Sequence, residues 1–431
     1  MSQPSKSRAA PARPGTAASL EQWLTYLEAL HPSEIDLGLD RVLLVLRKLM
    51  PGRPRARIIT VAGTNGKGST VACLEALLMA SGRRVGAYTS PHLSRYNERV
   101  RINGQEVSDQ TLVEAFEHIE AARGNTSLTY FEFGTLAAFL VMAAKGLEDW
   151  VLEVGMGGRL DAVNTLDPDL AIITSVDIDH VAWLGGDRES IGFEKAGILR
   201  PSVAAIYADE DPPRSVLQQA QAQNVRLWRF GEDYQLQDQG RAVAIAELQR
   251  VVPLPTLPLP LTSVAAAVRG ALWLEPALSD ETIHRALERV RVPGRFERFG
   301  DAPAIYLDVG HNPHAARWLA GKLTSLKERR VHGVYGCLAD KDASAVIHAL
   351  TGVVDHWYLA GLAVPRGLTV TELDQRLAPV LQSCPPSCHS TVTEALEEAL
   401  ARAAEDDLVV VFGSFYTVAE AREYLLASDR S

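Results

Sequence analysis

A glycine-rich segment at residues 63–70 combines a lysine with hydroxyl side chains. It reads Gly63, Thr64, Asn65, Gly66, Lys67, Gly68, Ser69 and Thr70. It lies between an apolar run and a helical pattern, so its backbone N–H groups could turn towards phosphate oxygens at a helix N-terminus. Lys67 would reach the β- and γ-phosphates of ATP, and Ser69 or Thr70 would meet Mg²⁺. The segment predicts ATP binding, although only two residues separate the glycines before Lys67 and Gly68 precedes the hydroxyls. A glycine-rich turn without a ligand is the alternative.

Three further polar residues lie at or after predicted strands. Ser90 follows a strand at 85–88, Glu153 lies within a strand at 150–154, and His180 follows a strand at 170–175. Since the carboxyl ends of parallel strands meet at one edge of a sheet, these side chains are expected beside the phosphate loop. Carboxylate and hydroxyl oxygens suit Mg²⁺, whereas imidazole is an unusual ligand for it. Each residue alone is better explained as a turn, core or ion-pair residue, but together they predict a metal site.

Ionisable residues in two other segments are expected near the same edge. Lys195 lies in a Glu-Lys-Ala-Gly-Ile sequence, where its alternative role is that of a solvated helix charge. Asp308 ends a strand at 304–308, and His311 and Asn312 follow it. These residues open a second α/β unit and are expected to face a cleft, although Asn312 could also simply cap the next helix.

The elements that position these residues alternate between strand and helix. Apolar residues at helical spacing predict helices within 20–50, and strands and helices then alternate from 58 to 207. A proline-rich stretch and two helices precede a second alternation from 304. This pattern predicts an α/β protein of two domains, an N-terminal P-loop-type, mostly parallel sheet with flanking helices and a smaller C-terminal Rossmann-like α/β domain. We place a disordered tail at 1–19, the ATP-binding domain at 20–296 and the C-terminal domain at 297–431.

Composition limits the classes of function. The chain has 431 residues, a net charge of −10, 47% hydrophobic and 22% charged residues. This acidic balance disfavours bulk binding to nucleic acid or to an anionic membrane. The most apolar stretch, 133–144, is too short to span a bilayer. The four cysteines favour reduced thiols over a disulfide framework or a zinc site. We expect a cytoplasmic monomer that acts on small molecules.

The motifs taken together resemble the folylpolyglutamate synthase/dihydrofolate synthase family, relatives of the Mur cell-wall ligases, and especially its bacterial bifunctional members. The resemblance covers nearly the whole chain from residue 20. The inserted Gly68 departs from the generic phosphate-loop pattern but matches the form of this loop in the family. The matching segments are 35–41, 61–70, 90–93, 98–99, 131–135, 153–161, 194–198, 293–296, 311–313, 340–342 and 413–418.

This resemblance implies a role for each group of residues. The magnesium ligands would be Ser90, Glu153 and His180. The ATP contacts would be residues 63–70 with Arg295 and Asp308. His311 and Ser414 would contact the incoming glutamate. Gly157, Arg159 and Asp161 would border the pterin substrate. Lys195 matches a lysine that the family carbamylates, a change that replaces a cation of pKa about 10.4 with an anion able to hold metal. The implied catalytic residues are Lys67, Lys195 and His311.

The activity implied by the resemblance is ligation of 7,8-dihydropteroate, and then of reduced folates, to L-glutamate. Transfer of the γ-phosphoryl group of ATP would convert the carboxylate into an acyl phosphate that an amine can attack. The chain departs from the family at 261–266, where neither the usual Gln nor the usual Asn is present. A Mur-type ligase of UDP-linked substrates is one alternative, disfavoured because no UDP-binding domain precedes residue 58. A nucleotide-binding pseudo-enzyme is the other, favoured only by the missing Gln and Asn.

Overall fold

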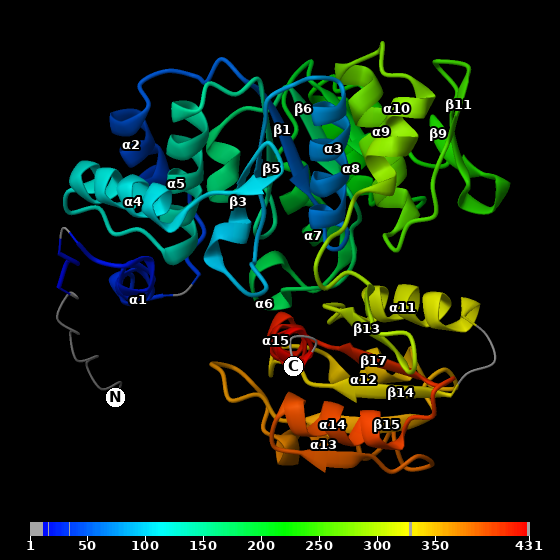
Figure 1. Ribbon diagram of the computed structural model, residues 1–431. Helices are drawn as coiled ribbons and strands as arrows, with labels where there is room; N and C mark the ends of the chain where they lie inside the picture. Colours follow the sequence, from blue (N-terminus) through cyan, green and yellow to red (C-terminus); the bar gives the residue numbers. More distant parts are fainter. Residues whose placement is uncertain (1–11, 16, 34, 327–329, 429–431) are drawn as a thin grey trace.

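The computed structural model describes residues 12–15, 17–33, 35–326 and 330–428, which form two α/β domains stacked one above the other (Figure 1). The predicted fold class is therefore confirmed. The tail predicted at 1–19 falls largely on residues 1–11 and 16, which lie outside the described residues. Ser19 is already the N-cap of the first helix, where it accepts a hydrogen bond from the Gln22 amide.

The larger domain is built on an eight-stranded sheet with the order β4-β3-β2-β5-β1-β6-β7-β8. The six strands from β2 to β8 in this order are parallel, and β3 and β4 add an antiparallel edge. Five of the six residues of the central strand β1 are buried, as expected for a strand covered on both faces. The bounds are β1 (Arg57–Ala62), β2 (Val85–Tyr88), β3 (Val100–Ile102), β4 (Gln105–Glu106), β5 (Asp149–Glu153), β6 (Leu170–Ile173), β7 (Ala204–Tyr207) and β8 (Leu227–Arg229).

Helices cover both faces of this sheet. One buried apolar cluster joins α3, α9 and α10 to the sheet, and another joins α1, α2, α4, α5, α7 and α8 to its other face. The apolar stretch at 133–144 lies within α5, a helix that is buried over most of its length and begins with a Thr129–Glu132 capping box. The bounds are α1 (Leu20–Leu30), α2 (Asp40–Leu49), α3 (Lys67–Ala80), α4 (Asp109–Arg123), α5 (Tyr130–Ala144), α6 (Val181–Leu184), α7 (Arg188–Ala196), α8 (Arg214–Ala222), α9 (Leu261–Leu274) and α10 (Asp280–Glu288), with 3₁₀ helices η1 (Tyr96–Arg99), η2 (Ala162–Thr165) and η3 (Asp238–Gly240).

The polar, proline-rich region between β8 and α9 forms a small antiparallel sheet of three strands. Its strands are β9 (Tyr234–Gln237), β10 (Ala242–Ile245) and β11 (Arg250–Pro253). A buried arginine of α9, Arg269, ties this sheet to the domain. Its guanidinium lies 3.6 Å from the centre of the Trp228 ring and donates to Glu247 at 2.9 Å.

The smaller domain contains a six-stranded sheet with the order β12-β13-β17-β14-β15-β16, parallel except for β12. Helices α11, α12 and α13 cover one face, and α14 and α15 cover the other. The strands are β12 (Glu297–Phe299), β13 (Ala304–Asp308), β14 (Val331–Tyr335), β15 (His356–Ala360), β16 (Ser387–His389) and β17 (Leu408–Phe412). The helices are α11 (Pro313–Ser325), α12 (Ala343–His348), α13 (Val370–Leu377), α14 (Val392–Arg402) and α15 (Phe415–Ser428).

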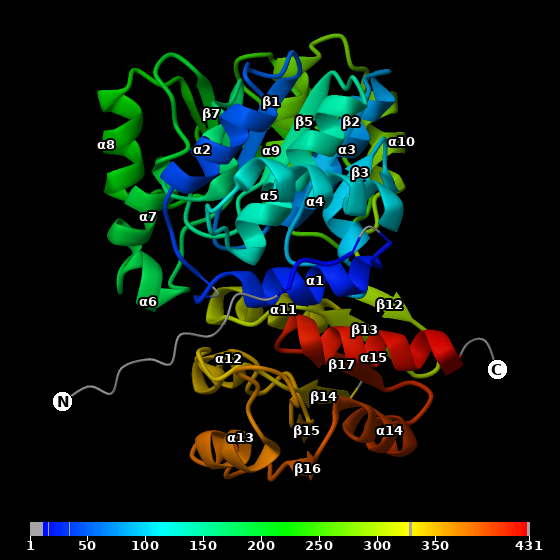
Figure 2. The same cartoon turned by 90° about the vertical axis from the view of Figure 1, so that its left-hand side faces the viewer.

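The two domains meet along the loops that follow their strands. In both views α11 lies on the side of the smaller domain that faces the larger one, and α6 lies on the opposing side (Figures 1 and 2). Leu93, from the loop after β2, belongs to the same apolar cluster as Val309 and Val418 of the smaller domain. The linker residue Gly294 has φ +67°, and its carbonyl accepts a hydrogen bond from the Val309 amide at 2.8 Å. These contacts hold the carboxyl ends of β1, β5 and β6 opposite those of β13 and β17.

Candidate active site

A cavity of about 500 Å³ lies between the two domains. Most residues predicted for the site line it, and they come from both domains. The lining residues among them are Gly63, Thr64, Asn65, Gly66, Lys67, Ser69, Ser90, Glu153, Gly157, His180, Lys195, Arg295, Asp308 and His311. The predicted residues outside the lining are Gly68, Thr70, Arg159, Asp161 and Ser414.

The phosphate loop has a backbone that only glycine adopts easily at two positions. Gly63 has φ +150° and Gly66, the N-cap of α3, has φ +84°. The Lys67 ammonium folds back on its own loop and donates to the Gly63 carbonyl at 3.0 Å. Burial lowers the pKa of Lys67, and the Glu153 carboxylate opposes that shift. The Ser69 hydroxyl is buried and has no hydrogen-bond partner among the described residues, so it is free to bind a ligand of the loop.

Side chains that directly follow β6 and one side chain of α9 hold this loop, and sequence reasoning did not single out Thr174 or Ser175. The Thr174 hydroxyl donates to the Asn65 carbonyl at 2.6 Å, and the Ser175 hydroxyl accepts from the Asn65 amide at 3.1 Å. The Ser263 hydroxyl lies so close to Gly66 that a Cβ at residue 66 would be only 2.4 Å from it. The sequence signal that could have identified Thr174 and Ser175 is a Thr-Ser pair directly after β6, the strand that pairs with β1. Ser263 therefore lies against the phosphate loop, within the segment 261–266 where the resemblance implies a Gln and an Asn.

The predicted metal ligands converge on the loop from three strand ends. Glu153 is buried at the end of β5 and accepts a hydrogen bond from the Ser90 amide at 3.2 Å. Burial raises the pKa of Glu153, opposed first by the Lys67 ammonium. Burial also lowers the pKa of His180 to about 4, so its imidazole is neutral near pH 7 and has a lone pair for a cation. The described residues contain no cluster of three His, Cys, Asp or Glu side chains placed to hold a metal. A cation held by the predicted set of Ser90, Glu153 and His180 would need further oxygen ligands, such as phosphate or water.

Lys195, near the end of α7, points its ammonium into the cavity. The residue is only 3% exposed, and the ammonium has no hydrogen-bond or ion-pair partner among the described residues. Burial lowers the pKa of Lys195 to about 7, and the positive charge of Lys67 adds to that shift. Lys195 is therefore a buried amine that loses its proton readily.

The five predicted residues outside the cavity lining have structural contacts. Gly68 faces the Glu153 carboxylate, and the Thr70 hydroxyl donates to the Gly66 carbonyl at 3.0 Å. Arg159 pairs with Glu194 at 2.8 Å, close to Lys195 in sequence. Asp161 is buried and accepts from the Met156 and Val163 amides, and burial raises its pKa to about 7. The Ser414 hydroxyl accepts from the Thr417 amide at 3.0 Å at the start of α15.

Arg295 and Asp308 bring opposite charges to the linker side of the cavity. The Asp308 carboxylate accepts hydrogen bonds from the Phe296 and Gly310 amides at 2.9 and 2.8 Å. Burial raises the pKa of Asp308, while the Arg295 guanidinium opposes the shift. The guanidinium lies 5.4 Å from the centre of the Phe415 ring. Arg295 thus adds a further buried cation to the cavity, close enough to Lys67 and Glu153 to act on both electrostatically.

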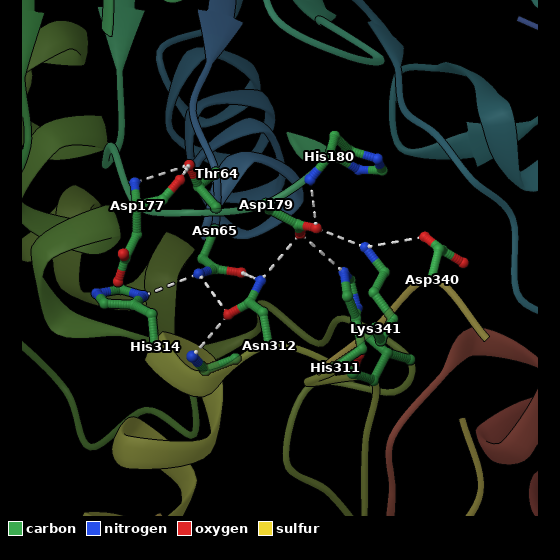
Figure 3. Close-up of polar contacts among 12 residues, drawn as sticks. Thr64, Asn65, Asp177, Asp179, His180, His311, Asn312, His314, Asp340 and Lys341 are labelled. Carbon is green, nitrogen blue, oxygen red and sulfur yellow. Dashed lines mark hydrogen bonds and ion pairs between the residues drawn. The ribbon is translucent and has the colours of Figure 1, made fainter. Parts of the chain in front are cut away.

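Asp179, directly before His180, connects the loop after β6 to the smaller domain (Figure 3). Its carboxylate accepts from the Lys341 ammonium at 2.5 Å and lies 3.3 Å from Nε2 of His311. Burial alone would raise the pKa of Asp179, but its contacts with His311, His180 and Lys341 hold it well below its usual range. The other ring nitrogen of His311 faces the Val309 carbonyl at 3.0 Å. Asp179 thus fixes the position of His311 relative to the loop that carries His180.

This arrangement suits the transfer of a phosphoryl group to a bound acid. A nucleophile held at the second domain could then displace the phosphate. The larger domain supplies a phosphate loop, buried cations and metal-ligand candidates, and the smaller domain supplies an imidazole across the cavity. These features define a ligase of the Mur type. The Mur ligase middle domain matches residues 61–252, and the Mur ligase glutamate ligase domain matches residues 294–415.

Comparison with individual proteins narrows the class. The chain is 44% identical over 416 residues to the Escherichia coli dihydrofolate synthase/folylpolyglutamate synthase, covering 96% of this chain and 97% of that protein. The structure of E. coli FolC in complex with DHPP and ADP superposes with a TM-score of 0.92 and 42% identity, covering 97% of this chain and 100% of that one. The structure of the Yersinia pestis bifunctional folylpolyglutamate synthase/dihydrofolate synthase complexed with AMPPNP and Mn ion superposes with a TM-score of 0.89 and 43% identity. The match covers 96% of this chain and 100% of that one. The chain belongs to the dihydrofolate synthase/folylpolyglutamate synthase family.

Proposed function

We propose that this chain is an ATP-dependent ligase that joins L-glutamate to 7,8-dihydropteroate and adds further glutamates to reduced folates. The observation that carries the proposal is the single cavity lined by the phosphate loop, by Lys195 and by His311 of the other domain. The relatives that support it are bifunctional in name and, in their crystal structures, bind ADP with DHPP or AMPPNP with a Mn ion.

In this proposal the reaction has two steps. A carboxylate oxygen of the acceptor attacks the γ-phosphorus of ATP, the bond to the β-phosphate oxygen breaks, and ADP leaves. The glutamate amine then attacks the carbonyl carbon of the acyl phosphate, the C–O bond to phosphate breaks, and the amine loses a proton. Lys67 and Arg295 offset the negative charge on the phosphoryl group in flight, which is the main electrostatic demand of such a transfer. His311 and Ser414 position the glutamate.

The divalent cation fits the residues at the loop. Ser90, Glu153 and His180 would hold Mg²⁺, and the unpartnered Ser69 hydroxyl lies in the same cavity. When bound, Mg²⁺ supplies charge neutralisation at the phosphates. Gly63, Thr64, Gly66, Gly68 and Thr70 shape the loop around the phosphates, and Asp308 lies beside the nucleotide.

A carbamate on Lys195 is part of the proposal. The neutral amine attacks CO₂ and loses a proton, which gives a carboxylate in place of an ammonium. The burial of this amine without a partner supports the idea, because a second cation beside Lys67 is unfavourable there. Gly157, Arg159 and Asp161 are proposed to border the pterin substrate.

The remaining assignments concern the whole chain. We propose domains at 20–296 and 297–431, supported by the start of the six-stranded sheet at β12. None of the helices within the described ranges has the length and apolar character of a membrane span. We propose a cytoplasmic monomer.

The test measures ADP release by the purified chain with Mg²⁺, L-glutamate and either dihydropteroate or tetrahydrofolate. The expected result is ADP release that requires both glutamate and the pterin acid, with one amide product per ADP. A chain that releases no ADP with either acceptor would contradict the proposal. UDP-linked peptidoglycan precursors serve as the control acceptors, for which no turnover is expected.

A further inference from the structure

The side-chain amide of Asn312 crosses the boundary between the domains (Figure 3). Its Nδ2 donates to Oδ1 of Asn65 at 2.9 Å and to Oδ2 of Asp179 at 3.2 Å. Its Oδ1 accepts from Nδ2 of Asn65 at 3.1 Å and from the Ala315 amide at 3.0 Å. An amide has two N–H donors and two lone pairs, and all four are used here. Asn312 is 3% exposed, so these bonds are made away from water.

This pattern fixes the amide in one orientation. If the amide were turned over, its oxygen would face the Asp179 carboxylate and its NH₂ group would face the Ala315 N–H. Only the bond from Ala315 is needed to cap α11, and Ser or Asp could make it equally well. The other three bonds need both the donor and the acceptor of an amide, and all three reach the larger domain.

The partners of Asn312 lie in the two loops that carry the proposed nucleotide and metal contacts. Asn65 is two residues before Lys67, and its own backbone is held by Thr174 and Ser175. Asp179 directly precedes His180 and also holds Lys341 and His311. A shift of the smaller domain therefore breaks bonds to both loops at once.

We propose that Asn312 is a positioning residue that holds the glutamate-binding domain against the phosphate loop while the acyl phosphate exists. The inference rests on the proposed ligase function. With the amide bridge made, the glutamate amine faces the acyl phosphate and water is excluded. With the bridge broken, the smaller domain moves away, and water attacks the same carbonyl carbon. That side reaction releases phosphate and regenerates the carboxylic acid, so ATP is consumed without amide formation.

The experiment compares variants of the full chain by the ratio of ADP to amide product. Asn312→Ser keeps the cap of α11 but is too short to reach Asn65 and Asp179. We expect its ratio to rise well above one and its KM for glutamate to rise about ten-fold, since hydrogen bonds to a charged and a neutral partner are lost. The KM for ATP should stay within about two-fold, because the phosphate loop keeps its own contacts. Asn312→Asp also keeps the cap but faces Asp179 with a like charge, so its ratio should be higher still.

Thr391→Ala is the matched control. Thr391 caps α14 in the same domain through a capping box and is not among the residues that line the cavity. This variant should lose thermal stability through its cap and yet keep a ratio of one. The inference is wrong if both Asn312 variants keep a ratio of one with the wild-type KM for glutamate, or if Thr391→Ala raises the ratio as much as they do. A wild-type chain that releases no ADP would contradict the proposed function instead. If Asn312→Ser fails to fold, Asn312→Asp alone tests the inference by the same two criteria, the ratio of ADP to amide and the KM for glutamate.

Discussion

Two lysines, Lys67 and Lys195, face the same cavity, and burial lowers the pKa of both. They differ in their surroundings. Lys67 donates to carbonyls of its own loop and has Glu153 as the leading counter-charge, whereas Lys195 has no hydrogen-bond or ion-pair partner within the described ranges. A phosphate bound at the loop would compensate Lys67 directly, because Lys67 belongs to that loop. The remaining amine is most stable when it is neutral or converted into an anion.

This difference gives the first prediction. Lys195→Ala should lower turnover by about 10- to 100-fold, the usual cost of losing a group that supports a metal site. Wild-type turnover should fall in buffer freed of CO₂ and recover when bicarbonate is added, because the pKa near 7 leaves neutral amine available. Turnover of Lys195→Ala should not respond to bicarbonate. Wild-type activity that is indifferent to bicarbonate would contradict the carbamate.

The positions of single residues could be predicted from the sequence where the chain itself brings the residues together. The spacing of Gly63, Gly66 and Lys67 between a strand and a helix is local, and these residues line the cavity as expected. Thr174 holds the same loop but lies far away in sequence, so no pattern within the loop identifies it. Ser414 was predicted to meet a substrate, yet its hydroxyl is occupied at the start of α15, and its role remains a prediction.

At the scale of elements, the turn between β1 and α3 depends on a close approach to β6. A Cβ on Gly63 would lie 1.8 Å from the Thr174 hydroxyl oxygen, and the φ of +150° disfavours any side chain. Gly63→Ala should therefore weaken ATP binding at least about ten-fold, because the loop must move away from Thr174. Gly82→Ala is the control, since Gly82 has φ +89° but open space around it. That variant should lose about 1 kcal/mol of stability and bind ATP normally, as measured by calorimetry and thermal melting. Equal losses of affinity in both variants would show that the crowding at Thr174 is unimportant.

Elements with a strong local signal were predicted closely. The strands expected at 85–88 and 304–308 have those bounds, and the first of the two helices expected after the proline-rich stretch begins at Leu261, after Pro260. Pro260 can precede a helix because the first turn does not need its missing N–H. The edge strand β16 was not predicted. It has only three residues and no buried apolar run, so the sequence pattern does not identify it. It is a strand because it pairs with β15.

At the scale of the whole molecule, the site depends on how the domains meet. Asp179 and Lys341 are separated by 162 residues, and their ion pair is largely shielded from water. The strand–helix alternation predicts two α/β domains and a cleft, but it does not specify which loops touch across that cleft. Those pairs follow from the linker geometry and from side-chain complementarity at the boundary. The sequence therefore indicates the chemistry of each half of the site. The docking of the domains determines which residues of the two halves face each other.

The one cavity also predicts how the two proposed activities share the enzyme. Dihydropteroate and tetrahydrofolate would both present a carboxylate to the same phosphate loop and to the same His311. With both acceptors saturating, ADP release should fall between the two single-substrate rates, because each molecule excludes the other. Two independent sites would give the sum of the rates. His311→Ala should lower both activities by a similar factor, since it serves the same amine in each reaction. Rates that add, or a His311→Ala variant that loses one activity and keeps the other, would require a second acceptor site outside this cavity.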